Sequence, residues 1–204
     1  MRLMRLVVTG TAGAGKSTFV RTVSDIEAID TDRAATDETA QIKQKTTVAF
    51  DFGRLSFGPR LEIHIYGTPG QSRFNFMWDI LIQRANAYVL LVAAHRIDEL
   101  VKARQIIAFM NERVQIPMVI GLTHRDCPGA RSPEEIAMRL GYTDLSNLPT
   151  IVTVNPNEKN SVLETLNVML MSYLMSQLAP DLNTVPARQN FGQEEYRPRV
   201  QIVR

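Results

Sequence analysis

The nine residues GTAGAGKST, from Gly10 to Thr18, constrain the fold of this chain more than any other stretch. They match the pattern G-x-x-x-x-G-K-[ST]. An apolar, β-branched run at residues 3–9 precedes them, and residues 16–26 continue with apolar side chains on one side of a helix. Between a strand and a helix, this pattern turns backbone N–H groups toward phosphate oxygens. The stretch therefore predicts a phosphate-binding loop.

Each part of this loop has a physical role in holding phosphate. Glycines let the backbone N–H groups turn inward, and the helix N-terminus adds its positive end. We expect Lys16 to reach the β- and γ-phosphates and Ser17 to offer its hydroxyl to Mg²⁺. The predicted contact residues are Gly10, Thr11, Ala12, Gly13, Ala14, Gly15, Lys16, Ser17 and Thr18. The loop does not choose the base, because small-molecule kinases that use ATP carry the same pattern.

Strand and helix patterns alternate along the chain. Strands are expected at residues 3–9, 47–55, 61–66, 87–93, 117–122 and 150–154. Helices are expected at 16–26, 77–84, 98–113 and 161–178, with a further helix starting at Ser132, and a polar loop is expected at 30–46. Gly58-Pro59 marks a hairpin turn. This order predicts an α/β, three-layer P-loop sandwich with a mostly parallel sheet and one antiparallel hairpin strand.

Composition limits the domain organisation and the partners. The chain has 204 residues, 45% of them hydrophobic, so it can bury a full core. Residues 1–179 are predicted to form one domain and 180–204 an extended tail. The net charge of +2 gives no case for nucleic acid, and a single cysteine fits the cytoplasm. No signal peptide, spanning run or lipidation motif is seen, so no direct membrane anchor is expected.

After the loop come KTTVAFDF, residues 45–52, and GTPGQSRF, residues 67–74. Their order and spacing resemble the two switch segments of Ras-like small GTPases, most closely those of the bacterial MglA-like and Arf-like group. The resemblance implies that Thr47, with Thr46 as the fallback, closes over the γ-phosphate and gives Mg²⁺ a second hydroxyl beside Ser17. It implies that the N–H of Gly70 contacts the γ-phosphate and that Gln71 orients the attacking water.

Two later segments are similar to the base-reading loops of the same family. The stretch Thr123-His124-Arg125-Asp126 stands where the family has N-K-x-D. The Asp126 carboxylate can accept hydrogen bonds from guanine N1–H and the exocyclic amine, a donor pair that adenine lacks. By the same resemblance, Asn155, Pro156 and Asn157 lie near the base oxygen. Since proline has no N–H, Asn157 is the expected donor there.

The chain departs from the family at Gly67, where the family has an aspartate that meets Mg²⁺ through a water. Losing that carboxylate removes negative charge near the metal but neither hydroxyl ligand. We therefore expect weaker Mg²⁺ retention and a slow enzyme, with Asp51 or Asp32 as possible replacements. His124 in place of lysine is a second departure, and its ring could stack on the base.

The predicted function is a GTP-binding molecular switch that hydrolyses GTP to GDP, with Lys16 and Gln71 in catalytic roles and Mg²⁺ as cofactor. The resemblance implies effector proteins and a roadblock-type, MglB-like GTPase-activating regulator. Two alternatives stay open. One is a pseudo-GTPase that holds nucleotide without turnover, which Gly67 and His124 favour. The other is an ATP-dependent small-molecule kinase, which Asp126 opposes.

Overall fold

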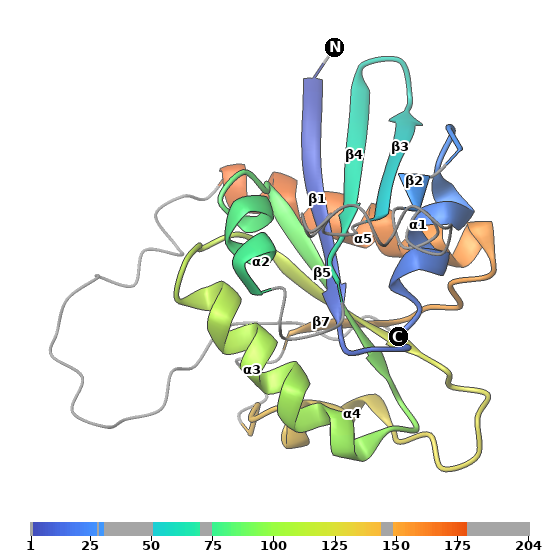
Figure 1. Ribbon diagram of the computed structural model, residues 1–204, viewed down its shortest axis with the longest axis vertical. Helices are drawn as coiled ribbons and strands as arrows, with labels where there is room; N and C mark the ends of the chain where they lie inside the picture. Colours follow the sequence, from blue (N-terminus) through green and yellow to red (C-terminus); the bar gives the residue numbers. More distant parts are fainter. Residues whose placement is uncertain (1, 28, 31–50, 70–74, 144–148, 179–204) are drawn as a thin grey trace, which may run out of the picture.

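Seven strands form one sheet at the centre of the molecule (Figure 1). The computed structural model describes residues 2–27, 29–30, 51–69, 75–143 and 149–178. In chain order the strands are β1 (Arg2–Gly10), β2 (Ile29–Asp30), β3 (Asp51–Phe57), β4 (Leu61–Gly67), β5 (Ala87–Ala93), β6 (Met118–Thr123) and β7 (Thr150–Thr153). They lie side by side in the order β2-β3-β4-β1-β5-β6-β7. Strands β4, β1, β5, β6 and β7 are parallel, and β3 runs antiparallel to β4.

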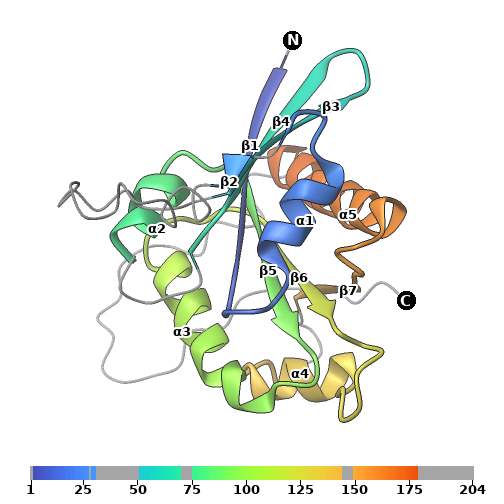
Figure 2. The same ribbon diagram turned by 45° about the vertical axis from the view of Figure 1, so that its right-hand side comes forward.

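Helices cover both faces of the sheet (Figure 2). On one face lie α1 (Lys16–Val23) and α5 (Lys159–Leu178). On the other lie α2 (Asn75–Ile82), α3 (Leu100–Asn111) and α4 (Pro133–Arg139). A short 3₁₀ helix, η4 (Ile97–Glu99), leads into α3. We call these the α1–α5 face and the α2–α3 face. The predicted three-layer α/β sandwich is confirmed by this arrangement.

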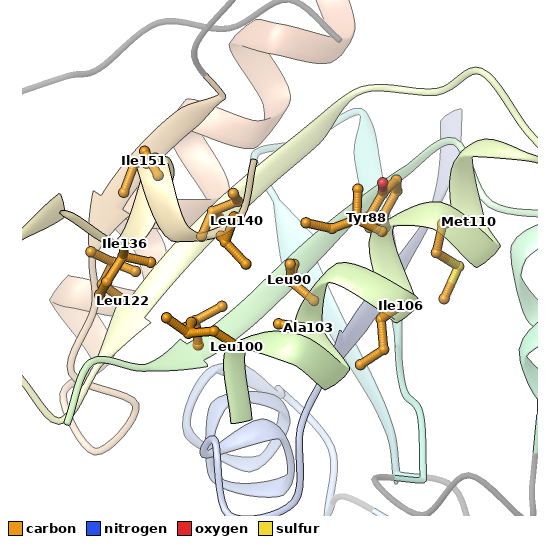
Figure 3. Close-up of a cluster of buried hydrophobic side chains, with 14 of the residues drawn as sticks. Tyr88, Leu90, Leu100, Ala103, Ile106, Met110, Leu122, Ile136, Leu140 and Ile151 are labelled. Atoms are coloured by element: carbon orange, nitrogen blue, oxygen red, sulfur yellow. The ribbon is translucent and has the colours of Figure 1, made fainter. Parts of the chain in front are cut away.

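Alternating side chains of the central strands fill two separate cores. In β5, Tyr88 and Leu90 point to the α2–α3 face, whereas Val89 and Leu91 point to the α1–α5 face. Figure 3 shows Tyr88 and Leu90 against side chains of α3. Because successive side chains of a strand point to opposite faces, a strand covered on both sides must be apolar throughout. This explains why β5 reads AYVLLVA.

Several element boundaries differ from the predicted ones. Helix α1 ends at Val23, not at residue 26, because Ser24 leaves the helix and its Oγ accepts the backbone N–H of Arg54 at 3.1 Å. The predicted helix at 98–113 is divided into η4 and α3. Helix α4 begins as predicted, with the Ser132 side chain accepting the N–H of Glu135 at the N-cap.

The prediction of one antiparallel hairpin strand omitted β2. Asp30, assigned to a loop from the sequence, pairs with Asp51, and Ile29 pairs with Phe52, in a second antiparallel pairing. Two residues are too few to show an alternating pattern, so β2 had no sequence signal. Residues 47–50, which were expected to begin the next strand, and the predicted tail at 180–204 lie outside the described residues.

The sheet brings several loops to one edge. The carboxyl ends of β1, β4, β5, β6 and β7 share this edge because the strands are parallel. Since β3 is antiparallel, its first residue, Asp51, lies at the same edge beside Gly67. Within the described ranges, no helix combines the length and the apolar character needed to cross a bilayer.

Leu90 is predicted to be a stability-determining residue of the α2–α3 face. It is fully buried, so Leu90→Ala should lower the free energy of unfolding by about 2–5 kcal/mol. Val101 on α3 is 62% exposed, and Val101→Ala should change it by less than about 0.5 kcal/mol. Guanidinium denaturation of the two variants measures both values. Equal effects would contradict the buried position of Leu90.

Candidate nucleotide-binding site

Three loops at the carboxyl edge of the sheet line one cavity of about 420 Å³. The loop after β1, the loop after β6 and the loop after β7 each contribute. The lining residues are Gly13, 15–18, His124, Asp126 and 155–157. All of them were predicted as nucleotide-binding residues from the sequence. The structure thus brings together segments that lie more than a hundred positions apart in the chain.

The phosphate loop adopts backbone angles that need glycine. Gly13 and Gly15 have φ of 71° and 91°. Gly10 has φ of 143°, and a Cβ there would lie only 2.2 Å from the carbonyl oxygen of Leu91. A Cβ on Gly15 would lie 2.8 Å from Cγ of Pro156, so the loop after β7 packs directly against the phosphate loop. The glycines therefore allow close approach as well as the turn.

Lys16 lies inside this loop. Its Nζ donates to the carbonyl oxygens of Gly10 at 3.0 Å and Thr11 at 2.7 Å. The side chain is buried, and burial lowers the pKa of Lys16 to about 8, while the Asp51 carboxylate acts in the opposite direction. At neutral pH the group is therefore a mostly protonated ammonium with two carbonyl partners, held where phosphate oxygens would replace them.

Thr123 joins the loop after β6 to the phosphate loop. Its Oγ1 is fully buried, lies 3.1 Å from the carbonyl oxygen of Ala14 and donates to it. The same Oγ1 lies 2.9 Å from Nδ1 of His124. A hydroxyl has one proton, so donation to Ala14 requires the His124 Nδ1–H to donate to Thr123. Thr123 thus braces the loop, where the sequence had assigned it only a place in the base-reading motif.

His124 is held in an unusual conformation and faces another histidine. Its φ is 55°, a left-handed value that is uncommon for residues other than glycine. The ring lies 5.1 Å from that of His95, centroid to centroid. Desolvation, followed by the electrostatic effects of His95 and Arg96, lowers the pKa of His124 below its usual range, and Asp126 only partly offsets this. His124 is therefore neutral at pH 7 and presents an aromatic ring to the cavity.

The loop after β7 differs from the expectation in one respect. The N–H of Asn157 was predicted to reach the base, but it donates to Oδ1 of Asn155 at 3.1 Å. Asn155 also donates from Nδ2 to Glu158 at 2.8 Å. Pro156 is fixed from α1, since Thr22 Oγ1 donates to its carbonyl oxygen at 2.6 Å. Asn157 would have to leave Asn155 before it could donate to a ligand.

Two residues that the sequence reasoning did not assign to the site also contact it. Arg96 Nη1 donates to the carbonyl oxygen of Ala12 at 3.2 Å, and it lies 2.8 Å from the position of a Cβ on Gly13. The ring of His95 contacts that of His124 in a tilted arrangement, with an interplanar angle of 52°. Both follow β5, and their position at the carboxyl edge of a parallel sheet was the signal available in the sequence.

Other predicted residues cannot be placed. Thr47, Thr46, Gly70, Gln71 and Asp32 lie outside the described residues. Among the residues that are described, no three histidine, cysteine or acidic side chains gather into a metal cluster. A Mg²⁺ ion uses few protein ligands beside phosphate oxygens and water, so Ser17 and a nearby carboxylate suit it. Ser17 lines the cavity and Asp51 acts electrostatically on Lys16.

The pKa of Lys16 predicts the pH dependence of ligand binding. The free protein loses the ammonium proton near pH 8, below the usual 10.5, whereas a bound phosphate favours the charged form. The dissociation constant of a nucleotide should therefore rise with pH above 8, approaching tenfold per unit. Calorimetric titration between pH 7 and 9 measures it. Lys16→Arg keeps its charge and should give a flat profile; a flat profile for the native chain would contradict this assignment.

The fold and the sequence have known counterparts. The small GTPase Arl6 (BBS3) of Trypanosoma brucei, solved with the nucleotide analogue GppNp, superposes with a TM-score of 0.63 and 16% identity, over 85% of this chain and 99% of that one. At such identity the likeness shows the fold alone. The uncharacterized protein MJ1339 of Methanocaldococcus jannaschii is 28% identical over 94 residues, 46% of this chain. The match covers 53% of MJ1339, so the chain spans about half the length of this curated relative.

A family pattern covers most of the chain. The family described as "Conserved hypothetical ATP binding protein" matches residues 25–187, which begin after α1 and therefore leave out the phosphate loop, but include the loops that follow β6 and β7. These comparisons do not single out the MglA-like group, which stays a prediction. With more than half of its residues matched, the chain belongs to this family of conserved hypothetical ATP-binding proteins, on the fold of a small GTPase.

Proposed function

We propose that this protein binds GTP with Mg²⁺, hydrolyses it to GDP, and acts as a nucleotide-dependent switch. The observation that carries the proposal is the cavity at the carboxyl edge, where the phosphate loop and the Asp126 loop face one ligand-sized space. Phosphate recognition and base recognition are then parts of a single site. Nucleotide binding by a P-loop fold is common to the family and to the structural neighbour.

Asp126 is the basis for proposing guanine. An ionised carboxylate accepts hydrogen bonds, and guanine offers two donors on one edge, whereas adenine would leave the carboxylate unpaired. Thr123 holds this loop against Ala14, which fixes the distance between base and phosphate sites. The neutral ring of His124 lines the same cavity and provides an apolar surface for a base. The rival is adenine, which the description of the family names.

The reaction proposed is in-line attack of water on the γ-phosphate. The inward-facing amides of the loop and the Lys16 ammonium would bind the β- and γ-phosphates and stabilise their developing charge. Ser17 would hold Mg²⁺, which neutralises phosphate charge when bound, with Thr47 as a second hydroxyl. By resemblance, Gln71 would orient the water. Turnover is proposed to be slow without a partner, for which a roadblock-type, MglB-like regulator is the candidate.

The switch proposal rests on a link between the end of β4 and the α2–α3 face. The carbonyl oxygen of Pro69, which directly precedes Gly70, accepts from the indole Nε1 of Trp78 at 3.2 Å. Trp78 is buried and packs edge-on against Phe109 of α3, with ring centroids 5.4 Å apart. Arg113 lies over Phe109 and also pairs with Asp79 of α2. A movement of Gly70 toward a γ-phosphate would therefore change the hydrogen bond between Trp78 and Pro69.

Two experiments separate this proposal from its rivals. Single-turnover hydrolysis distinguishes a switch from a module that holds nucleotide without turning it over. Base preference distinguishes it from an ATP-dependent kinase or an adenine-binding member of the family.

Asp126→Asn should change the base that is bound. The amide oxygen can accept the N1–H of the base, but the amide nitrogen is a donor at position 2. It therefore pairs with the carbonyl oxygen of xanthine and not with the exocyclic amine of guanine. GTP affinity should fall by about 10- to 100-fold and XTP affinity should rise, as loss of a charged hydrogen bond predicts. Calorimetric titration of GTP, ATP and XTP measures this. Equal GTP and ATP binding by the native chain would contradict guanine recognition, and tighter ATP binding would favour adenine.

Trp78 provides a readout of the switch because it is the only tryptophan in the chain. Replacing bound GDP by a non-hydrolysable GTP analogue should shift its emission, since the Pro69 hydrogen bond sits beside Gly70. Trp78→Phe, lacking the fluorophore, gives the background. Superimposable spectra in the two nucleotide states would argue against a switch in this segment.

A further inference from the structure

A side chain at position 67 would lie in close contact with the carboxylate of Asp51. The two residues lie directly opposite each other in the antiparallel pair β3 and β4. A Cβ built on Gly67 would lie 3.0 Å from Cβ of Asp51 and 3.0 Å from its Oδ2. Such contacts are tighter than ordinary van der Waals packing. A side chain at residue 67 would therefore crowd Asp51, which would have to shift.

The alternation of the strands places this carboxylate on the side of the sheet that faces α1. Leu55 lies four positions after Asp51 in β3, and Ile65 lies two positions before Gly67 in β4. Both belong to the core of the α1–α5 face. By the period of two, Asp51 and Gly67 share that face. Val20 of α1 confirms it, because its Cγ2 lies 3.4 Å from the Gly67 Cβ position.

The N-terminus of α1 carries the groups with which such a carboxylate would act. Lys16 and Ser17 form its first turn and both line the cavity. The electrostatic effect of Asp51 reaches Lys16. No acidic side chain lies in the first turn of α1. Asp51 of β3 brings a carboxylate to the face of the sheet that α1 covers.

We propose that Asp51 supplies, from the neighbouring strand, the metal-facing carboxylate that Gly67 lacks, and that it orders the water shell of a Mg²⁺ ion held by Ser17 and the phosphates. This inference rests on the proposed function. It also explains why position 67 is glycine. Two carboxylates this close would repel each other and crowd, which favours a carboxylate at only one of the two positions.

The test is the Mg²⁺ dependence of nucleotide retention. A fluorescently labelled GDP is loaded on the full chain, and its dissociation is followed in EDTA and at increasing Mg²⁺. For Asp51→Asn, the Mg²⁺ concentration for half-maximal retention should rise by about tenfold or more, as for loss of an outer-shell ligand. Dissociation in EDTA should stay within about twofold of native. Asp98→Asn removes an exposed carboxylate on η4 and should change neither quantity.

A double variant that exchanges the two residues distinguishes loss of the carboxylate from loss of folding. Asp51→Gly combined with Gly67→Asp moves the carboxylate to the other strand and keeps charge and volume. It should recover most of the Mg²⁺ affinity that Asp51→Asn loses, which a merely structural role of Asp51 would not predict. Circular dichroism melting checks that all variants fold.

The outcomes are distinct. A Mg²⁺ midpoint of Asp51→Asn within twofold of native would overturn the inference while leaving GTP binding intact. Failure of the exchange variant to recover Mg²⁺ affinity, although it folds and binds GDP in EDTA, would also overturn it. If the native chain retains no labelled GDP even at high Mg²⁺, the proposed function fails, and the role of Asp51 fails with it.

Discussion

The central position of β1 is the constraint on which the rest of the structure depends. It lies between β4 and β5 with side chains buried on both faces, and its last residue, Gly10, pairs with Leu91 of β5. At Gly10 the approach to the Leu91 carbonyl oxygen leaves no room for a Cβ. On the other side, the N–H of Thr68 donates to the carbonyl oxygen of Val8 at 2.8 Å. The start of the phosphate loop is thereby fixed by backbone contacts to both neighbouring strands, before any side chain of the loop is considered.

Much of this could be read from the sequence because the signals were local. The apolar run of β5 and the matched loop pattern each depend on a few consecutive residues. The three loops that line the cavity were found through their motifs, and a parallel sheet brings such loops to one edge. Helix positions were predicted to within a few residues, and the errors arose where a tertiary contact ended an element. Ser24 is an example, since its bond to the backbone of β3 stops α1.

What the sequence could not provide was register. That Asp51 faces Gly67 depends on how β3 and β4 align, and a slip of one residue would turn that carboxylate to the opposite face. The sequence left Asp51 and Asp32 as equal candidates for this reason. The contact between the rings of His95 and His124 likewise joins residues from two different strand ends. In the structure without ligand, an Asn two residues earlier accepts the Asn157 N–H, a local competition that motif matching ignores.

The burial of Lys16 has a consequence for the protein without ligand. Unfolded, the side chain would keep its proton to about pH 10.5, but in the folded chain it does so only to about 8. Below pH 8 the folded state therefore carries the full cost of a desolvated charge, and its stability rises as the pH increases from 8 toward 10.5. At neutral pH an anionic ligand removes that cost by giving the ammonium a partner. The amount of folded chain in a cell would then follow the supply of ligand, so that the empty protein is the form most exposed to proteolysis.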